Sequence, residues 1–262
     1  MPVIWFLMSQ FLSAAGSLVD TIKINALSRE DRGGRTFWIK RRRWAARPIM
    51  GCANGFFRLA RNPIRALTET TEWQRWEVDC FLQLHGDHFQ AFTDGACAVA
   101  AEEVPGRSLS QHLNSGTLSE AMFVAAGIEL RRAHEMSSDH FHGSAWSHGD
   151  AHAGNFIYEE AADRARLIDF EVKHHWRWSA HERHSEDLLA FLQDIAGRIA
   201  PGQWLPSAHA FLGAYARPEV ISALRRKLVV PGGFARIWWA VRTTYMAPAE
   251  LRRRIAALRE SL

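Results

Sequence analysis

The chain has 262 residues, of which 47% are hydrophobic and 23% charged. This is the composition of an ordinary globular protein, long enough for one large domain or two smaller lobes, and it excludes a disordered or fibrous chain. Three cysteines without metal-ligand spacing argue against a disulfide framework and favour a reducing compartment: Cys52, Cys80 and Cys97.

The N-terminal residues 1–18 are apolar, but they lack the basic region of a signal peptide. The apolar run is also shorter than the roughly 20 residues that span a bilayer. We therefore expect a packed or interfacial helix here, no transmembrane span and a cytoplasmic location.

Two strand-like segments follow, "LVDTIKINAL" (18–27) and "RTFWIK" (35–40), with the turn-rich "SREDRGG" between them. The next stretch, to about residue 67, is rich in arginine and aromatic residues, and we expect it to be irregular. Positive charge is concentrated in this region. Ten lysines and arginines lie between Arg32 and Thr68, where there is no acidic residue, and the rest of the chain has 22 basic and 28 acidic residues. Such a segment is either a solvated face or a surface for an anionic partner.

A helix is predicted from about Thr70 to Leu84, because Trp73, Trp76, Cys80, Phe81 and Leu84 form an apolar stripe at helical spacing. Glu77 lies in the middle of this stripe. A buried carboxylate is costly unless a cation meets it, so Glu77 is expected to have a cationic partner.

In the rest of the chain, the sequence predicts a β-rich stretch at 91–104 and then a helix from Leu118 to about Glu135. A short hairpin and a series of helices complete the sequence. A β-rich first part with one main helix, followed by a mostly helical second part, indicates an α+β fold of two lobes joined near Glu102–Gly106.

The stretch "WSHGDAHAGNFIYEEAADRARLIDFE" (146–171) carries polar groups at fixed spacings. Asp150 lies in a loop, Asn155 opens the next strand, and Asp169 ends the strand antiparallel to it. The hairpin should bring Asn155 and Asp169 towards each other. One carboxylate with one amide oxygen suits Mg²⁺, which binds few carboxylates together with substrate phosphates. Asp150 is left to accept a proton from an attacking hydroxyl, as phosphoryl transfer requires.

These residues resemble the protein-kinase-like superfamily. The pattern His148-Gly149-Asp150-x-His152-x-x-Asn155, followed by Ile168-Asp169-Phe170-Glu171, is closer to the lipopolysaccharide-kinase and aminoglycoside-phosphotransferase-like branches than to eukaryotic protein kinases. The resemblance implies a bilobal fold, with an N-lobe at residues 1–104 and a C-lobe at 105–262.

The resemblance also implies a role for each matching residue, with ATP and Mg²⁺ as cofactors. Asp150 would be the catalytic base, with His152 near the transferred phosphate and His148 structural. Lys40 resembles the strand lysine that holds the nucleotide phosphates, and Glu77 would be its helix partner. The remaining assignments are Asn155 and Asp169 as magnesium ligands and the backbone from Glu102 to Val104 as the adenine-binding segment.

The sequence departs from the family pattern at several positions. No glycine-rich loop is evident between the first two strands, because Gly33-Gly34 more plausibly form the turn into the Lys40 strand. Trp38 shares a strand face with Lys40, where such kinases carry a small residue. Gly149 replaces the arginine that senses activation-loop phosphate in protein kinases, and Glu171 replaces a glycine.

The expected activity is phosphate transfer from ATP to a hydroxyl, most plausibly on a sugar of a lipopolysaccharide-type glycolipid core. The basic segment would then dock the enzyme on the inner membrane face. A soluble small-molecule or protein acceptor and a catalytically inactive pseudokinase are the alternatives. Nucleic acid is a less favoured partner, although Trp44, Phe56 and Phe57 alternate with arginines as in a stacking surface. The histidines show no zinc-site pattern, and four of them are expected near the substrate or on the surface: His174, His175, His181 and His184.

Overall fold

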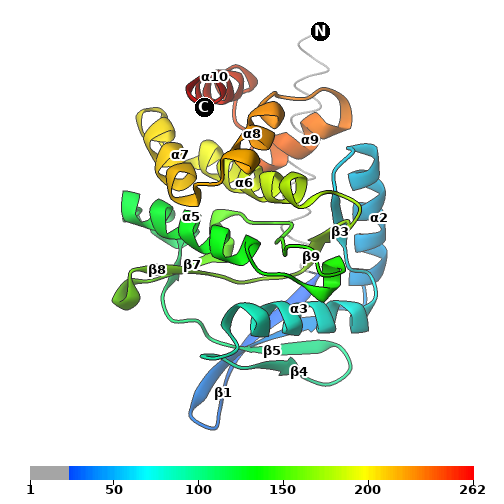
Figure 1. The fold of residues 1–262 in the computed structure, drawn as a ribbon. Coiled ribbons are helices and arrows are strands. Elements are labelled where there is room, and N and C mark those ends of the chain that lie inside the picture. The colour runs from blue at the N-terminus through cyan, green and yellow to red at the C-terminus, as the bar shows by residue number, and fades with distance from the viewer. Residues whose placement is uncertain (1–23) are drawn as a thin grey trace.

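The computed structural model describes residues 24–262. The predicted N-terminal helix and residues 18–23 of the first predicted strand lie outside this range. The first half of the described chain is rich in strands, whereas the second half is mostly helical. Figure 1 shows a four-stranded sheet at one end of the molecule and helices α6 to α10 at the other.

The four-stranded sheet is antiparallel, with the order β1-β2-β5-β4. Its strands are β1 (Asn25–Arg32), β2 (Arg35–Arg42), β4 (Ala91–Thr93) and β5 (Ala98–Glu102). Helix α3 (Thr70–His85) packs on β4 and β5 (Figure 1), and its apolar stripe enters the main core. The predicted helix at 70–84 and the β-rich stretch at 91–104 are therefore confirmed.

The prediction for the first strand and its turn was wrong in its position. The strand covers Asn25–Arg32, so most of "SREDRGG" is strand, and Asn25 to Arg32 pair in register with Arg42 to Arg35. Only Gly33 and Gly34 form the turn, with φ of 59° and 80°. Two successive left-handed residues make the tight hairpin turn whose twist matches the strands. The charged residues are tolerated because β1 is an edge strand with an exposed surface.

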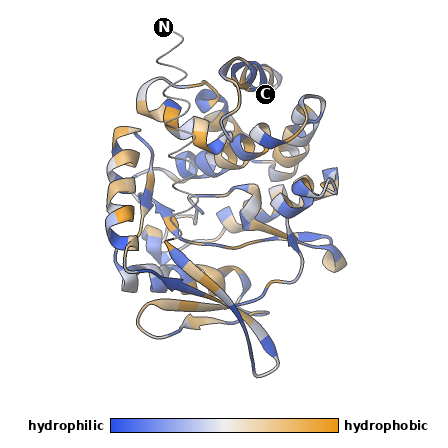
Figure 2. Cartoon of the chain, turned by 180° about the vertical axis from the view of Figure 1, so that it is seen from behind, coloured by the Kyte–Doolittle hydropathy of each residue, from blue (hydrophilic) through white to orange (hydrophobic). Residues whose placement is uncertain are grey.

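The segment expected to be irregular instead contains helix α2 (Ala46–Leu59). Its buried residues, Ala46, Met50 and Phe57, recur at helical spacing, and Figure 2 shows hydrophobic and hydrophilic segments alternating along the helix. Pro48, Gly51 and Gly55 obscured this pattern. Proline is tolerated in the first turn of a helix, and the buried face here compensates for the low helix propensity of glycine.

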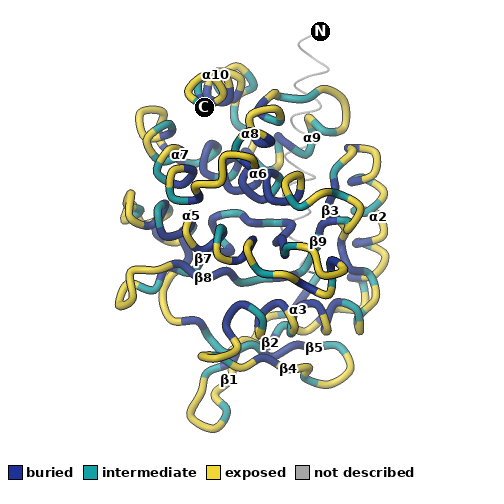
Figure 3. Tube along the Cα trace, in the orientation of Figure 1, coloured by how far each residue is buried: buried dark blue, intermediate teal, exposed yellow. Residues whose placement is uncertain are grey.

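The helical part surrounds one large hydrophobic core, to which α3 also contributes. The sheet of β6 (Arg107–Ser108), β7 (Phe156–Glu159) and β8 (Arg164–Leu167) lies beside α4 (Leu109–Asn114) and α5 (Glu120–His134). The chain ends with α6 (Ala180–Arg198), α7 (Pro201–Tyr215), α8 (Pro218–Lys227), α9 (Gly233–Arg242) and α10 (Pro248–Ser261). Much of α6 is buried, whereas the outer face of α2 is exposed (Figure 3). The predicted helix at 118–135, the hairpin and the terminal helices are confirmed.

Besides the packing of α3 in the main core, a pair of short strands joins the first part of the chain to the helical part. Strand β3 (Ile64–Ala66) pairs with β9 (Val172–His174), three residues after Asp169, in a two-stranded antiparallel sheet. Beside it, α2 packs against α9. A separate hydrophobic cluster of Met50, Phe57, Ile64 and Ala66, with Trp238 and Val172 against it, fills this junction. The segment after β2 is therefore anchored to the helical part.

Candidate active site

Lys40 is the centre of an ion cluster that draws on three elements. On β2, Phe37 and Ile39 face a small core with β5, so Lys40 projects from the opposite face. Lys40 Nζ lies 2.6 Å from Glu77 Oε1 on α3, and Nζ also donates to Asp169 Oδ1. Glu171 Oε1 is 3.4 Å away. The cation required by the buried position of Glu77 is thus Lys40.

Glu77 is held on its other side as well, because Trp73 Nε1 donates to its Oε2 at 3.0 Å. Burial lowers the pKa of Lys40, but the charges of Asp169, Glu77 and Glu171 outweigh this and hold it well above its usual value. Burial would raise the pKa of Asp169, yet the charge and hydrogen bond of Lys40 lower it. Lys40 is therefore an ammonium ion and Asp169 a carboxylate at neutral pH.

Glu171 extends this cluster, and its pKa is shifted in the opposite direction to that of Asp169. Burial, followed by the charge of Asp169, raises its pKa to about 7. Its Oε1 accepts a hydrogen bond from Asn25 Nδ2 on β1. The backbone between these acids is also unusual, because Asp169 has φ of 69°, a region that few residues other than glycine adopt. Lys40 thus meets more negative charge than it can neutralise.

The loop that carries Asp150 is fixed by a buried carboxylate of α6. Asp187 is fully buried, and its two oxygens accept from His148 N and Gly149 N at 2.8 Å each. His134 Nε2 lies 3.0 Å from Asp187 Oδ2. Gly149 has φ of 94°, and a Cβ there would come within 3.3 Å of Val172 and Lys173, so a side chain is disfavoured. Two backbone hydrogen bonds to Asp187 therefore hold the loop against α6.

The histidine before Gly149 joins the loop to the strand that leads to Asp169. Asp150 N donates to His148 Nδ1 at 3.2 Å, so the ring proton is on Nε2, which lies 3.0 Å from the carbonyl oxygen of Ile168. The same logic applies to His152, whose Nδ1 accepts from Gly154 N at 3.0 Å. Its Nε2–H faces Asp150 Oδ2 at 3.8 Å. Asp150 and His152 are each 40% exposed, which leaves them accessible to a substrate.

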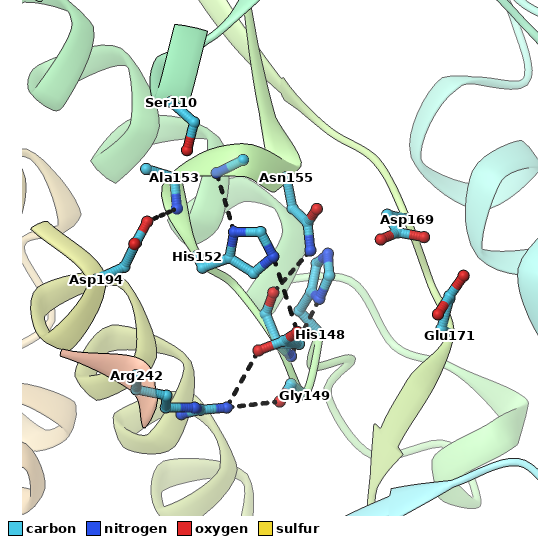
Figure 4. A network of polar contacts seen from close by, with 12 residues as sticks. Ser110, His148, Gly149, His152, Ala153, Asn155, Asp169, Glu171, Asp194 and Arg242 are labelled. Atoms are coloured by element: carbon cyan, nitrogen blue, oxygen red, sulfur yellow. Dashed lines mark hydrogen bonds and ion pairs between the residues drawn. The ribbon is translucent and has the colours of Figure 1, made fainter. Parts of the chain in front are cut away.

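Asn155 connects the loop with the Asp169 side of the site. Its Nδ2 donates to the carbonyl oxygen of Asp150 at 2.9 Å, and Ile168 N donates to the carbonyl oxygen of Asn155 at 3.0 Å. Because the amide nitrogen is used in this way, Oδ1 is left without a hydrogen-bond partner among residues 24–262. Figure 4 shows Asp169 and Glu171 on one side of Asn155, and Asp194 and Arg242 on the other.

This donor set fits a magnesium ion. An amide oxygen without a partner, the ionised Asp169 and the nearby Glu171 are oxygen ligands, which Mg²⁺ prefers. The surplus negative charge around Lys40 would also be relieved by a cation. Within the described range, no group of three or more histidine, cysteine or acidic side chains could hold a metal ion alone.

Comparison of the sequence and the structure with known proteins identifies the fold that carries this site. No protein-family model and no curated protein matches the sequence. Among solved structures, an ethanolamine kinase from Plasmodium vivax is similar over 91% of this chain and 79% of the other, with a TM-score of 0.50 and 11% identity. The chain has a protein-kinase-like fold. The α+β class and the resemblance predicted from the sequence are confirmed at this level.

Two other solved structures are similar with lower scores. An ADP-bound aminoglycoside phosphotransferase matches over 94% of this chain and 95% of its own, with a TM-score of 0.42 and 13% identity. A protein from Mycobacterium tuberculosis in complex with erythromycin matches over 71% of this chain, with a TM-score of 0.41 and 16% identity. This chain spans only about half (51%) of that protein.

In this kinase-like fold, the segment predicted to bind adenine lies at the end of β5. Glu102 N and Glu103 N already donate to the carbonyl oxygens of Gln90 and Thr36 at 2.8 Å each, and the Glu102 carboxylate pairs with Arg35. Within the described range, Val104 N–H makes no hydrogen bond. Of the predicted backbone groups, the Val104 amide is therefore the donor available to a ligand.

Trp38 lies on the Lys40 face of β2, as the alternation predicted, and is 43% exposed. Its Nε1 donates to Glu103 Oε1 at 3.1 Å, and Arg29 pairs with the same carboxylate at 2.6 Å. The indole is thereby held beside the end of β5.

Some residues around the site were missed or misplaced by sequence reasoning. His174 and His184, expected near the substrate or on the surface, are buried, with 1% and 6% exposure. His174 binds Ser147 Oγ, and His184 binds the carbonyl oxygen of Trp146 and stacks on His134. Asp187 had a signal, since it precedes the apolar run "LLAFL" as a carboxylate on a buried face. Arg242 had none, because it lies 92 residues from Asp150.

Proposed function

We propose that this chain is an ATP- and Mg²⁺-dependent phosphotransferase that transfers the γ-phosphate to an acceptor hydroxyl. The observation that supports this most is the Lys40–Glu77–Asp169 cluster, facing the Asp150 loop within a protein-kinase-like fold. The proposed lobes are residues 1–104 and 105–262. Their β3–β9 and α2–α9 contacts keep the two sets of residues facing each other.

In this proposal each side chain has one task. Lys40, oriented by Glu77, binds the nucleotide phosphates. Asn155 and Asp169 hold Mg²⁺, which when bound neutralises phosphate charge and orients the transferred group. The nucleotide base binds at Glu102 to Val104, with the Val104 amide as donor and the Trp38 ring against the base.

Asp150 receives the proton of the acceptor hydroxyl. As the acceptor oxygen bonds to the γ-phosphorus, the bond from that phosphorus to the bridging oxygen breaks and ADP leaves. Among residues 24–262, Asp150 Oδ2 accepts no hydrogen bond, and it lies 3.8 Å from His152 Nε2–H, which places a donor beside the reacting group. His152 is proposed to lie near the transferred phosphate.

The proposed acceptor is a sugar hydroxyl of an anionic, lipopolysaccharide-type glycolipid at the inner membrane face. Support comes from the exposed face of α2 and the residues flanking it. The segment from Trp44 to Arg61 has no acidic residue and presents Arg47, Arg58, Arg61 and Leu59, and Trp44 before the helix is 93% exposed. Arg47 is paired with Glu69 at 2.8 Å, so Arg58 and Arg61 carry most of the unpaired charge of this surface. Each arginine near an anionic bilayer contributes about 1 kcal/mol. No helix within residues 24–262 is long and apolar enough to cross a membrane, so any membrane association proposed for them is peripheral.

Not all arginines of this segment are available for docking. Arg42 is buried, its guanidinium stacks 4.2 Å from the Trp73 ring centroid, and Nη1 donates to the carbonyl oxygen of Leu67. Burial lowers its pKa to about 10, which still leaves it charged at neutral pH. Arg42 supports the fold, so a docking experiment must leave it intact.

The activity is tested with the full chain, γ-labelled ATP and either Mg²⁺ or EDTA. We expect ATP binding in the presence of Mg²⁺, loss of binding in Lys40→Met, and label transfer to a lipopolysaccharide core preparation. Binding without transfer to any glycolipid would direct the search to soluble small molecules or proteins. A chain that neither binds nor hydrolyses Mg·ATP would be a pseudokinase, contrary to the proposal.

Docking is tested separately by co-sedimentation with anionic and neutral vesicles at two salt concentrations. We expect binding to anionic vesicles only, weakened by salt and by the triple change Arg47→Ser, Arg58→Ser and Arg61→Ser. The triple change Arg225→Ser, Arg226→Ser and Arg259→Ser, at exposed positions of α8 and α10, is the control matched for the loss of three charges. Equal binding to both vesicle types, or tight binding to single-stranded nucleic acid instead, would contradict membrane docking.

A further inference from the structure

Arg242, the last residue of α9, forms a second charged centre of the site together with Asp150. Its Nη2 lies 3.2 Å from Asp150 Oδ1 and 3.5 Å from the carbonyl oxygen of Gly149 (Figure 4). The Arg242 side chain is only 8% exposed, whereas that of Asp150 is 40% exposed. A buried cation thus contacts the accessible carboxylate of the proposed base from one side.

The position of Arg242 is set by aromatic packing that begins on α2. The Arg242 guanidinium lies 4.6 Å from the Trp238 ring centroid, one helical turn earlier on α9. The Trp238 ring in turn meets Phe57 at 5.1 Å and Phe56 at 6.4 Å between centroids. These rings belong to the cluster at the α2–α9 junction. An unbroken series of contacts therefore runs from α2 through Trp238 and Arg242 to Asp150.

The partners of Arg242 differ from those of an arginine that only supports the fold. Arg254 on α10 is as buried, and it donates to the carbonyl oxygens of Ala196 and Ile199 at 2.9 Å and to Glu250 at 2.7 Å. Among the described residues, Arg242 instead donates only to Gly149 and Asp150, both in the loop of the proposed base, besides its stacking on Trp238. Burying a guanidinium is costly unless an acceptor meets it, and here the acceptors that meet it belong to the Asp150 loop.

We infer that Arg242 is a positioning residue for Asp150, held in place by the Phe57–Trp238 packing of α2 and α9. By binding Oδ1, Arg242 fixes the rotation of an otherwise exposed carboxylate. Oδ2 is then left to receive the acceptor proton, beside His152. The inference rests on the proposed function for the role of Asp150. It means that α2, through Trp238, helps to position Arg242 in the active site.

The test measures phosphate release from Mg·ATP by the full chain, with water as the acceptor. Arg242→Ala should lower turnover about 10- to 100-fold, the scale of a misplaced reactive group, while the Kd for ATP changes less than twofold. Arg242→Lys should recover part of the loss, and added guanidinium ion should restore Arg242→Ala but not Asp150→Asn. Trp238→Leu should lower turnover by a smaller factor. In the double variant with Arg242→Ala, turnover should be about that of Arg242→Ala alone, because both changes act through the same contact.

Arg253→Ala is the matched control, because Arg253 is an exposed arginine of α10 that pairs with Glu250, away from the Asp150 loop. It should keep wild-type turnover and show no response to guanidinium. Unchanged turnover in Arg242→Ala would overturn the inference. So would a loss accompanied by lower stability and weaker ATP binding that neither lysine nor guanidinium recovers, because that pattern belongs to a structural residue.

A thermal-unfolding cycle of Arg242→Ala and Asp150→Ala distinguishes failure of the inference from failure of the proposed function. If the wild type neither binds ATP nor releases phosphate, the proposed function fails, and the cycle alone decides the contact. Non-additive shifts in Tm would support the fixed pair, whereas additive shifts would overturn it.

Discussion

At Lys40 one cation meets three carboxylates, whereas at Asp150 one carboxylate meets one cation. The first centre has surplus negative charge and an unpartnered amide oxygen nearby, so it is suited to receive a further cation. The second is balanced and half open to solvent. In the proposed function the two sides of the site would therefore have different tasks, one binding charge and the other orienting a single reactive group.

The largest expected effect is on turnover. Asp150→Asn keeps the shape of the side chain but removes its ability to accept a proton. We expect turnover to fall about 10²- to 10⁴-fold, the usual contribution of a positioned general base, with ATP binding retained. Initial rates with Mg·ATP and calorimetric titration of the same preparation measure both quantities. Wild-type turnover would remove Asp150 from the proposed mechanism and the contrast with it.

The next effect concerns stabilisation by ligand. At 100 times Kd, a ligand that binds only the folded state contributes about 2.7 kcal/mol. Mg·ATP should therefore raise Tm in the wild type and in Asp150→Asn, but much less in Asp169→Asn, which lacks a ligand charge. Thermal melts with and without Mg·ATP measure the difference. Equal stabilisation of all three proteins would show that the Lys40 side is not the cation-binding side.

A smaller effect is the coupling between Lys40 and Glu77. Partners in contact show coupling of about 0.5–3 kcal/mol in double-mutant cycles. Glu77→Gln should lower turnover more than stability, because Lys40 keeps Asp169 and Glu171 as partners. In a Lys40→Met background the same change should have little further effect on turnover. Strictly additive losses would mean that Glu77 does not act through Lys40.

The smallest expected effect concerns how the free energy of unfolding depends on pH. Glu171, near Lys40, and His184, under the Asp150 loop, should contribute dependences of opposite sign. Glu171 has its pKa raised to about 7 by burial and Asp169, above its ordinary 4.5, so the folded state binds its proton more tightly and stability falls as pH rises between these values. His184, under the Asp150 loop, has its pKa lowered by burial to about 2, so its contribution to stability falls as pH drops below 6.5.

Urea unfolding from pH 4.5 to 8 measures both contributions. Glu171→Gln should flatten the decrease towards pH 7, and His184→Gln should flatten the decrease towards pH 4.5. Unaltered profiles in both variants would show that neither group titrates differently in the folded and unfolded chains.

The elements predicted correctly from the sequence are those whose pattern of apolar and polar residues is visible within one short segment. The Glu77 carboxylate within an apolar stripe indicated both a helix and a cationic partner, and the spacing from Asp150 to Asp169 placed a loop and a hairpin. These inferences worked because periodicity and burial depend on near neighbours. The roles assigned to Asp150, Asn155 and Asp169 remain predictions.

Other features depended on distant parts of the chain. Helix α2 was missed because its glycines and proline imitate a loop, and only packing against Ile64 and Trp238 reveals its buried face. Arg242 could not be found, because nothing near it in the sequence indicates contact with Asp150. The prediction for His174 and His184 was wrong because histidine occurs both in cores and on surfaces, and the neighbouring residues do not distinguish the two cases.

The β3–β9 pair has a mechanical consequence. The part of the chain before Pro105 is joined to the rest at the Glu102–Gly106 connection, at β3–β9 and along α3, whose apolar stripe enters the main core. Two bodies joined at several separate places cannot turn freely about any one of them. Any movement that separates Lys40 from Asp150 therefore has to bend these connections or disturb the packing of α3. We expect such a movement to stay small as long as the β3–β9 pair and the α3 packing persist.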